Sequence, residues 1–124
     1  MTVLIDSWAW IEYLKGSSFG QEAKKYIEGD DEVIVSSINI AEVYNFLLKN
    51  KQEEADALID FVLKTSFVIP LNSGIALQAA RNKYEKKFGM ADAIVLATAN
   101  LHDAIVVTGD DDFKKESNVV YIGK

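Results

Sequence analysis

The sequence predicts an α/β fold in which a parallel sheet is covered by helices on both faces. Short runs rich in β-branched residues recur along the chain, separated by stretches with helical periodicity. Strands that alternate with helices pair in parallel, because the chain crosses back over the sheet before it adds the next strand. With 124 residues, one proline and 49% hydrophobic residues, the chain is expected to form one domain over residues 1–124.

The first half of the chain is expected to supply two strands and several helices. Thr2–Ile5 and Val33–Ser36 are short, branched apolar runs of the kind that form buried strands. The stretches with helical periodicity are Trp8–Lys15, Phe19–Glu28, Ile38–Lys49 and Glu53–Thr65. In the last of these, Asp56, Asp60 and Lys64 recur every four residues opposite an apolar stripe, which is the pattern of a solvated helix face.

The second half is expected to complete the sheet. The predicted strands are Phe67–Ile69, Ala104–Thr108 and Val119–Ile122, and the predicted helices are Gly74–Phe88 and Met90–Leu101. In open parallel sheets, ligands bind beyond the carboxyl ends of the strands, where successive connections part to opposite faces. The polar residues at the predicted strand ends are therefore the first candidates for a functional site.

Composition narrows the chemistry available at such a site. The chain has no cysteine and one histidine, so thiolate chemistry is excluded and a zinc site is not expected. That histidine, His102, ends a predicted helix, where a structural role is expected. The net charge of −6 argues against a nucleic-acid binder that uses its whole surface, unless acidic residues hold cations. Without a signal sequence or a membrane-spanning apolar stretch, a cytoplasmic protein is expected, with no membrane partner.

Acidic residues gather at the predicted strand ends. Asp6 follows the first strand directly, and the fourth strand leads within two residues into the consecutive aspartates 110–112. Glu42 lies near the start of the helix after the second strand, and Asp92 lies near the start of the helix before the fourth. Both interrupt apolar stripes. A carboxylate on such a stripe is costly without a partner, and no lysine or arginine adjoins these acids in sequence.

Structural roles compete with a functional one for each acid taken singly. The aspartates after Gly109 are ordinary turn residues. Asp6 is placed to cap the first helix, and Asp92 is placed to interact with the dipole of its helix. Four acids directed to one crevice, however, favour an all-oxygen site for Mg²⁺ or Mn²⁺. Such ions activate water and stabilise charge on a phosphoryl group, so phosphodiester hydrolysis is the expected reaction.

Four stretches carry a resemblance that covers essentially the whole chain: VLIDSWAWIEYL, INIAEVYNFL, GMADAIVLATA and IVVTGDDDF. In this order and spacing they resemble the four acidic motifs of the PIN-domain nucleases, and more narrowly those of VapC-type toxin ribonucleases. The resemblance implies a three-layer α/β/α fold with a five-stranded parallel sheet in the order 3-2-1-4-5. It also implies a metal-dependent endoribonuclease that leaves a 5′-phosphate and a 3′-hydroxyl.

The resemblance assigns roles to the strand-end acids. Asp6, Glu42, Asp92 and Asp110 match the acidic quartet of the family. By this resemblance Asp6, Asp92 and Asp110 hold the metal and take part in catalysis. Glu42 binds through water or orients the nucleophile.

Other residues match the family motifs less directly. Thr108 and Ser7 match hydroxyl residues beside the last and first acids, and they are expected to support the metal ligands by hydrogen bonds. Asp112 matches the aspartate of the common DF pair and is a second choice of ligand, through water. Asp111 has no family role and is interpreted as a turn residue. Trp8 departs from the family, in which small residues are frequent at this position.

Partners follow from the same resemblance. It implies an RNA substrate, a homodimer, and a VapB-like antitoxin that blocks the acidic site. The densest basic segment supplies Arg81, Lys83 and Lys87 as candidate RNA contacts, although a solvated helix face explains them as well. Trp8 and Trp10 crowd the first helix, and the sequence leaves open whether they belong to the core or to an interface.

Three alternative functions remain at this point. A non-catalytic interaction module would keep the fold and use the acids as helix caps, and it would not need metal. A phosphorelay receiver domain requires paired acids after the first strand, an acceptor aspartate after the third and a lysine after the fifth. Here Asp6 stands alone, VIPLNSG has no acid, and Lys124 comes very late. A haloacid-dehalogenase-like phosphatase requires an aspartate where Trp8 stands.

Overall fold

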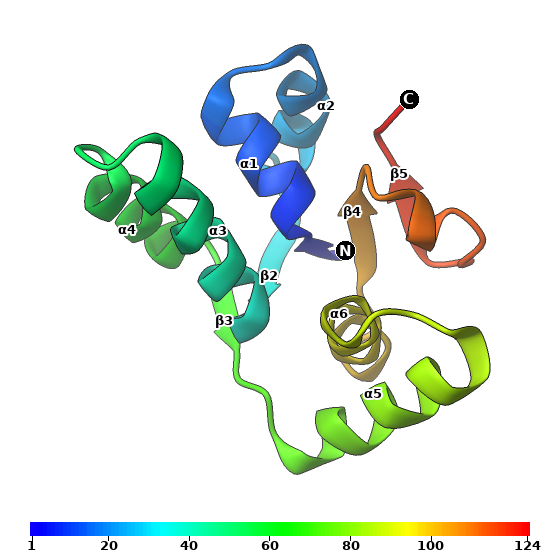
Figure 1. Cartoon of the computed structure of the whole chain (residues 1–124). Coiled ribbons are helices and arrows are strands. Elements are labelled where there is room, and N and C mark those ends of the chain that lie inside the picture. The colour runs from blue at the N-terminus through cyan, green and yellow to red at the C-terminus, as the bar shows by residue number, and fades with distance from the viewer.

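The computed structural model describes residues 1–124 and contains a five-stranded parallel sheet (Figure 1). The strands are β1 (Thr2–Ile5), β2 (Glu32–Ser36), β3 (Phe67–Ile69), β4 (Ile105–Thr108) and β5 (Val119–Tyr121). Their order is β3-β2-β1-β4-β5. The predicted fold class and sheet order are therefore confirmed, and the predicted strand bounds hold to within a residue at each end.

Six α-helices form the outer layers. They are α1 (Ser7–Lys15), α2 (Ser18–Ile27), α3 (Ser37–Asn50), α4 (Ala55–Thr65), α5 (Ser73–Lys86) and α6 (Met90–Leu101). A short 3₁₀ helix, η1 (Asp111–Phe113), follows β4. In Figure 1, α1 to α4 lie on one side of the sheet and α5 and α6 lie on the other. None of the helices is both long and apolar enough to cross a membrane.

Successive side chains of the central strand β1 point to opposite faces of the sheet, so they pack into two separate core clusters, one beneath each helix layer. Val3 and Ile5 pack with Trp10 in the cluster beneath α1 to α4, whereas Leu4 packs with Leu96 in the cluster beneath α5 and α6. All five side chains are fully buried. A run of consecutive apolar residues is required here because both faces of the parallel sheet are covered.

The register of the two central strands determines which residues meet at the carboxyl edge. Ile5 of β1 lies opposite Val107 of β4, and the Asp6 N–H donates to the Val107 carbonyl at 3.0 Å. The chain then leaves β1 for α1 on one face, while β4 receives the chain from α6 on the other. Asp6 and the residues after Thr108 consequently lie together at the switch point of the sheet, the usual ligand position in such folds.

Candidate metal centre

Asp6 is buried at the carboxyl end of β1, with only 5% of its surface exposed. It occupies the N-cap position of α1, as the cap interpretation predicted, but its side chain makes no capping hydrogen bond. Instead, Asp6 Oδ2 accepts a hydrogen bond from Thr108 Oγ1 at 2.8 Å, and Oδ1 accepts one from Asn39 Nδ2 at 3.3 Å. These contacts hold the carboxylate at the edge of the sheet.

Three further carboxylates converge beside it. Asp92 lies in the first turn of α6, and Asp110 and Asp112 lie at the start of η1. One oxygen from each of these three residues lies within 4.8 Å of the other two, a spacing that suits a shared cation. The Asp112 N–H donates to Asp110 Oδ1 at 2.9 Å, so the 3₁₀ turn itself brings Asp112 back toward the group. We call Asp92, Asp110 and Asp112 the carboxylate group.

Glu42 lies at the edge of the site. The expectation that Glu42 faces the core is wrong, because the side chain is exposed, whereas Asn39 and Val43 of the same helix are buried. Ser7 Oγ donates to Glu42 Oε1 at 2.6 Å, and the charge of Glu42 helps to raise the pKa of Asp6. Glu42 is therefore close enough to act on the site without belonging to the carboxylate group.

Hydroxyl groups connect the acids, as the sequence predicted for Ser7 and Thr108. Thr108, fully buried, donates to Asp6 through Oγ1, and the same oxygen accepts the Asp110 N–H at 3.0 Å. Ser7 Oγ, which donates to Glu42, accepts a hydrogen bond from Asn39 Nδ2 at 2.9 Å. Each hydroxyl thus uses both its donor and its acceptor capacity to fix the position of a site residue.

Asn39 was missed in the sequence. It is fully buried on α3, and its amide group contacts Asp6 and Ser7 while its Oδ1 accepts the Ser36 N–H at 3.1 Å. The last contact completes a capping box with Ser36 at the start of α3. A polar residue three positions after Ser36 and one helical turn before Val43 was the available signal. We call Asn39 a positioning residue because it orders Asp6 and Ser7 together.

The electrostatic state of the site reflects its burial and its like charges. Desolvation is the main reason why the Asp6 pKa rises from 3.8 to about 6, and the hydrogen bond from Thr108 partly opposes the rise. Desolvation, followed by the charges of Asp110 and Asp6, raises the pKa of Asp92 to about 7. No lysine or arginine forms an ion pair with either residue. In the absence of a cation, these two acids therefore take up protons at a higher pH than an ordinary aspartate does.

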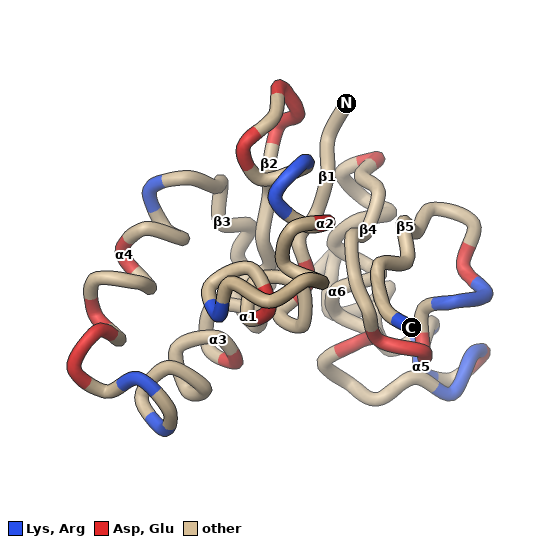
Figure 2. The backbone as a smooth tube through the Cα atoms, turned by 90° about the horizontal axis from the view of Figure 1, so that it is seen from above, with Lys and Arg blue, Asp and Glu red and all other residues tan.

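The remaining candidates lie outside the carboxylate group. Arg81, Lys83 and Lys87 are exposed, Lys83 Nζ donates to the Phe88 carbonyl, and Lys87 is the left-handed C-cap of α5. Figure 2 shows acidic and basic residues spread around the outside of the molecule, without a single basic face. His102 caps the end of α6 opposite Asp92, roughly 15 Å away at 1.5 Å per residue. A histidine base is therefore absent from the site.

The surroundings of Asp111 and of the two tryptophans bear on the roles expected for them. Asp111 begins η1, where its Oδ1 accepts a hydrogen bond from the Tyr121 hydroxyl at 2.5 Å and lies 3.4 Å from Lys114 Nζ. It therefore has structural contacts of its own, consistent with its interpretation as a turn residue. Trp10 is fully buried in the core, whereas Trp8 is only partly buried and packs beside Gly109.

These features are those of a PIN domain. The sequence profile of the PIN domain family matches residues 3–117, and the chain belongs to this family, as its acidic motifs predicted. No curated protein sequence matches the chain at a significant level.

Solved structures share the fold over nearly the whole chain. A toxin–antitoxin complex from Klebsiella pneumoniae superposes with a TM-score of 0.82 and 29% identity, covering 98% of both chains. VapBC2 from Rickettsia felis, bound to a promoter DNA fragment, gives a TM-score of 0.78 and 18% identity, covering 98% of this chain and 97% of that chain. VapC20 from Mycobacterium tuberculosis, described as a sarcin–ricin loop cleaving toxin, gives 0.69 and 14%, covering 82% and 84%.

Proposed function

We propose that the chain is a VapC-type toxin that hydrolyses RNA phosphodiesters with Mg²⁺ or Mn²⁺. The observation that carries this proposal is the convergence of three carboxylates within 4.8 Å, without a basic partner, at the switch point of a PIN domain. The similar solved proteins include toxin–antitoxin complexes and an RNA-cleaving toxin, which supports the same function.

The residues present fit a hard divalent cation. The site offers only oxygen ligands. Desolvation first, and then neighbouring carboxylates, raise the pKa values of Asp6 and Asp92, and a bound cation would stabilise the ionised forms of both residues. Asp92 and Asp110 would hold the ion, with Asp6 or Asp112 as the third carboxylate, directly or through water. When bound, the ion supplies an activated water and offsets charge on the phosphoryl group.

The protein residues direct the hydrolysis. Glu42, fixed by the hydrogen bond from Ser7, orients the attacking water toward phosphorus. The water oxygen bonds to phosphorus as the bond from phosphorus to the 3′-oxygen breaks, leaving a 5′-phosphate and a 3′-hydroxyl. Thr108 and Asn39 keep the Asp6 carboxylate in place, which fixes the geometry of neighbouring ligands.

The proposed partners follow from the family relationship. A VapB-like antitoxin would bind the chain and block the acidic site, and two copies of the single domain, residues 1–124, would form a homodimer in the cytoplasm. Arg81, Lys83 and Lys87 would contact RNA phosphates from the exposed end of α5. These contacts are electrostatic, so their contribution to RNA binding would weaken as the salt concentration rises.

Cleavage by the purified, antitoxin-free protein tests the proposal. We expect structured or unstructured RNA to be cut in Mg²⁺ or Mn²⁺, and cleavage to be lost with EDTA or in Asp92→Asn. Asp60→Asn, which changes an exposed acid paired with Lys64, is the matched control and should cleave normally. An absence of cleavage in either metal, with no Mn²⁺ bound by calorimetry, would instead support the non-catalytic interaction module.

A further inference from the structure

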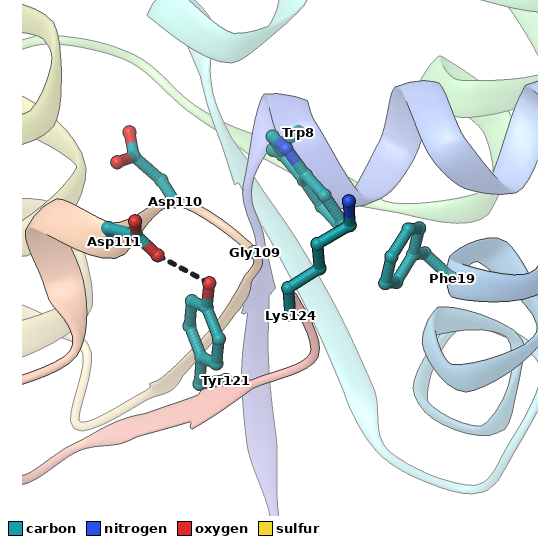
Figure 3. A pocket seen from close by; sticks show the side chains of 7 residues that line it. All are labelled: Trp8, Phe19, Gly109, Asp110, Asp111, Tyr121 and Lys124. Carbon is teal, nitrogen blue, oxygen red and sulfur yellow. Dashed lines mark hydrogen bonds between the residues drawn. The ribbon is translucent and has the colours of Figure 1, made fainter.

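A cavity of about 410 Å³ adjoins the carboxylate group. It is lined by the aromatic rings of Trp8, Phe19 and Tyr121, together with Lys124, Asp110 and Asp111 (Figure 3). Its volume lies within the roughly 300–1,000 Å³ range of small-molecule pockets. Because Asp110 belongs both to this cavity and to the carboxylate group, any ligand in the cavity would lie next to the proposed cleavage site.

The aromatic wall is held in place by specific packing. Trp8 meets Phe19 edge to face, with ring centroids 5.4 Å apart and an interplanar angle of 67°. The indole also lies directly over Gly109, where an added Cβ would come within 2.4–2.5 Å of three ring atoms. Gly109 is thus required by the close approach of Trp8. The indole is partly exposed at the cavity and is held between Phe19 and Gly109.

The opposite wall carries charges of both signs, from Asp111 and Lys124. The Tyr121 hydroxyl is bound to Asp111, and Lys114 Nζ lies 4.7 Å from the centroid of the Tyr121 ring. Figure 3 shows the Lys124 side chain extending between Tyr121 and the Trp8–Phe19 pair. Lys124 forms none of the ion pairs of the structure, so its ammonium is available to an anionic ligand.

We propose that this cavity binds one nucleobase of the RNA strand next to the cleaved phosphodiester, an inference that rests on the proposed function. The base stacks on Trp8, and Lys124 pairs with an adjacent phosphate. Aromatic rings beside a basic group are the usual means of holding single-stranded nucleic acid, because every base has a face that can stack. The aromatic rings and the free ammonium of Lys124 together favour RNA, because a basic peptide would be attracted by Asp110 and Asp111 but would leave Lys124 without a partner.

Tryptophan fluorescence tests base binding independently of cleavage. The chain has two tryptophans, and Trp10 is fully buried, so a response to RNA reports on Trp8. In the Asp92→Asn protein, a short single-stranded RNA should quench the emission saturably, and an abasic oligonucleotide of equal length should not. Trp8→Leu, which keeps apolar bulk without an aromatic ring, should remove the quench and weaken binding roughly tenfold. Trp8→Phe should retain most of the affinity.

Cleavage kinetics provide the second test. A series of substrates carries an abasic nucleotide at a different position around the cleaved bond in each. One of these substrates should raise the KM of the unaltered protein, and the same substrate should have little effect on the KM of Trp8→Leu. Lys124→Gln should weaken RNA binding severalfold, whereas Lys49→Gln, an exposed lysine on α3, should not.

The outcomes separate this inference from the proposed function. Metal-dependent cleavage that is unchanged in Trp8→Leu, at every substrate position, would overturn the base site and leave the nuclease standing. Fluorescence quenching by RNA, in a protein that cleaves no RNA, would support the base site and contradict the proposed nuclease function. A fluorescence response to a basic peptide and none to RNA would overturn the proposal in favour of a protein ligand.

Discussion

Two groups of acidic residues in this domain have opposite surroundings. Outside the site, five acids each lie 2.7–3.4 Å from a lysine ammonium: Glu12, Glu22, Asp60, Asp111 and Glu116. At the carboxyl edge of the sheet, Asp6 and the carboxylate group have no such partner. The three members of the carboxylate group also lie close together, with one oxygen from each within 4.8 Å of the other two.

Asp111 and Asp92 show how strongly the surroundings of two aspartates can differ. A hydrogen bond from Tyr121 and the charge of Lys114 lower the pKa of Asp111, whereas desolvation and then the charge of Asp110 raise the pKa of Asp92. Asp111 is thus stabilised as an anion by its contacts. Asp6 and Asp92 resist ionisation in the folded protein, and this cost is the physical reason to expect that a cation binds at the sheet edge.

The sharpest test of this comparison replaces two adjacent aspartates. Asp110→Asn should weaken Mn²⁺ binding at least about a hundredfold, because Asp110 is a ligand in either assignment of the metal site. Asp111→Asn is the matched control, since this side chain is exposed and held by Tyr121 and Lys114. Isothermal titration calorimetry measures both. Equal losses of Mn²⁺ affinity in the two variants would show that the aspartates 110–112 act only through their total negative charge.

A second test concerns the stability of the metal-free protein against pH. The Asp6 and Asp92 pKa values, about 6 and about 7, exceed the value of 3.8 expected for an unfolded chain. Their contribution to stability is therefore fully present below pH 3.8 and is lost as the pH rises through 6 and 7. For buried Asp6 the loss is on the order of 3 kcal/mol, from 1.36 kcal/mol per pKa unit.

Denaturant unfolding in EDTA at pH 5 and pH 8 measures the part of this loss that falls above pH 5, which is about 1.4 kcal/mol for Asp6. Asp6→Asn should reduce the difference between the two pH values, and Asp60→Asn should leave it unchanged. Mg²⁺ should raise the stability of the unaltered protein more at pH 8 than at pH 5, because metal competes with protons for the same oxygens. A metal-free protein that became more stable from pH 5 to pH 8 would contradict the assigned pKa directions.

The sequence predicted the layers and the strand-end acids because both depend on local signals. Branched apolar runs and helical periodicity located all five strands and all six α-helices, and α6 begins and ends where its periodicity does. Asp6 and Asp110 were identified because parallel strands end at one edge. The order of the strands came from the resemblance to the family, since no local pattern specifies which strands are neighbours.

The parts of the site that the sequence did not predict depend on side-chain orientation. The spacing of Glu42 placed it on an apolar stripe, but the helix leaves it exposed and directs Asn39 inward instead. Helical spacing predicts which residues share a face of the helix. It does not predict which residues of that face are exposed to solvent. The pocket beside Asp110 depends on Trp8 packing over Gly109, a contact between residues a hundred positions apart.

Asn39 offers a test of how the unpaired acids are held. Asn39→Ala removes the donor to Asp6 and Ser7 and also the acceptor for the Ser36 N–H, so we expect a loss of about 1–2 kcal/mol in the free energy of unfolding. Asn45→Ala, at an exposed position of the same helix, should change it by less than about 0.5 kcal/mol. Equal effects would indicate that helix propensity alone, and not the network, is measured.

The smallest effect is expected among the paired acids. Lys64→Gln removes the 2.8 Å pair with Asp60, in which both side chains are largely exposed. Water and salt screen such pairs, and ordering two long side chains has an entropic cost, so the free energy of unfolding should change very little. Urea unfolding at low and high ionic strength measures the change. A clear loss of stability that disappeared at high ionic strength would show that surface ion pairs stabilise this fold, and it would weaken the contrast with the buried acids at the sheet edge.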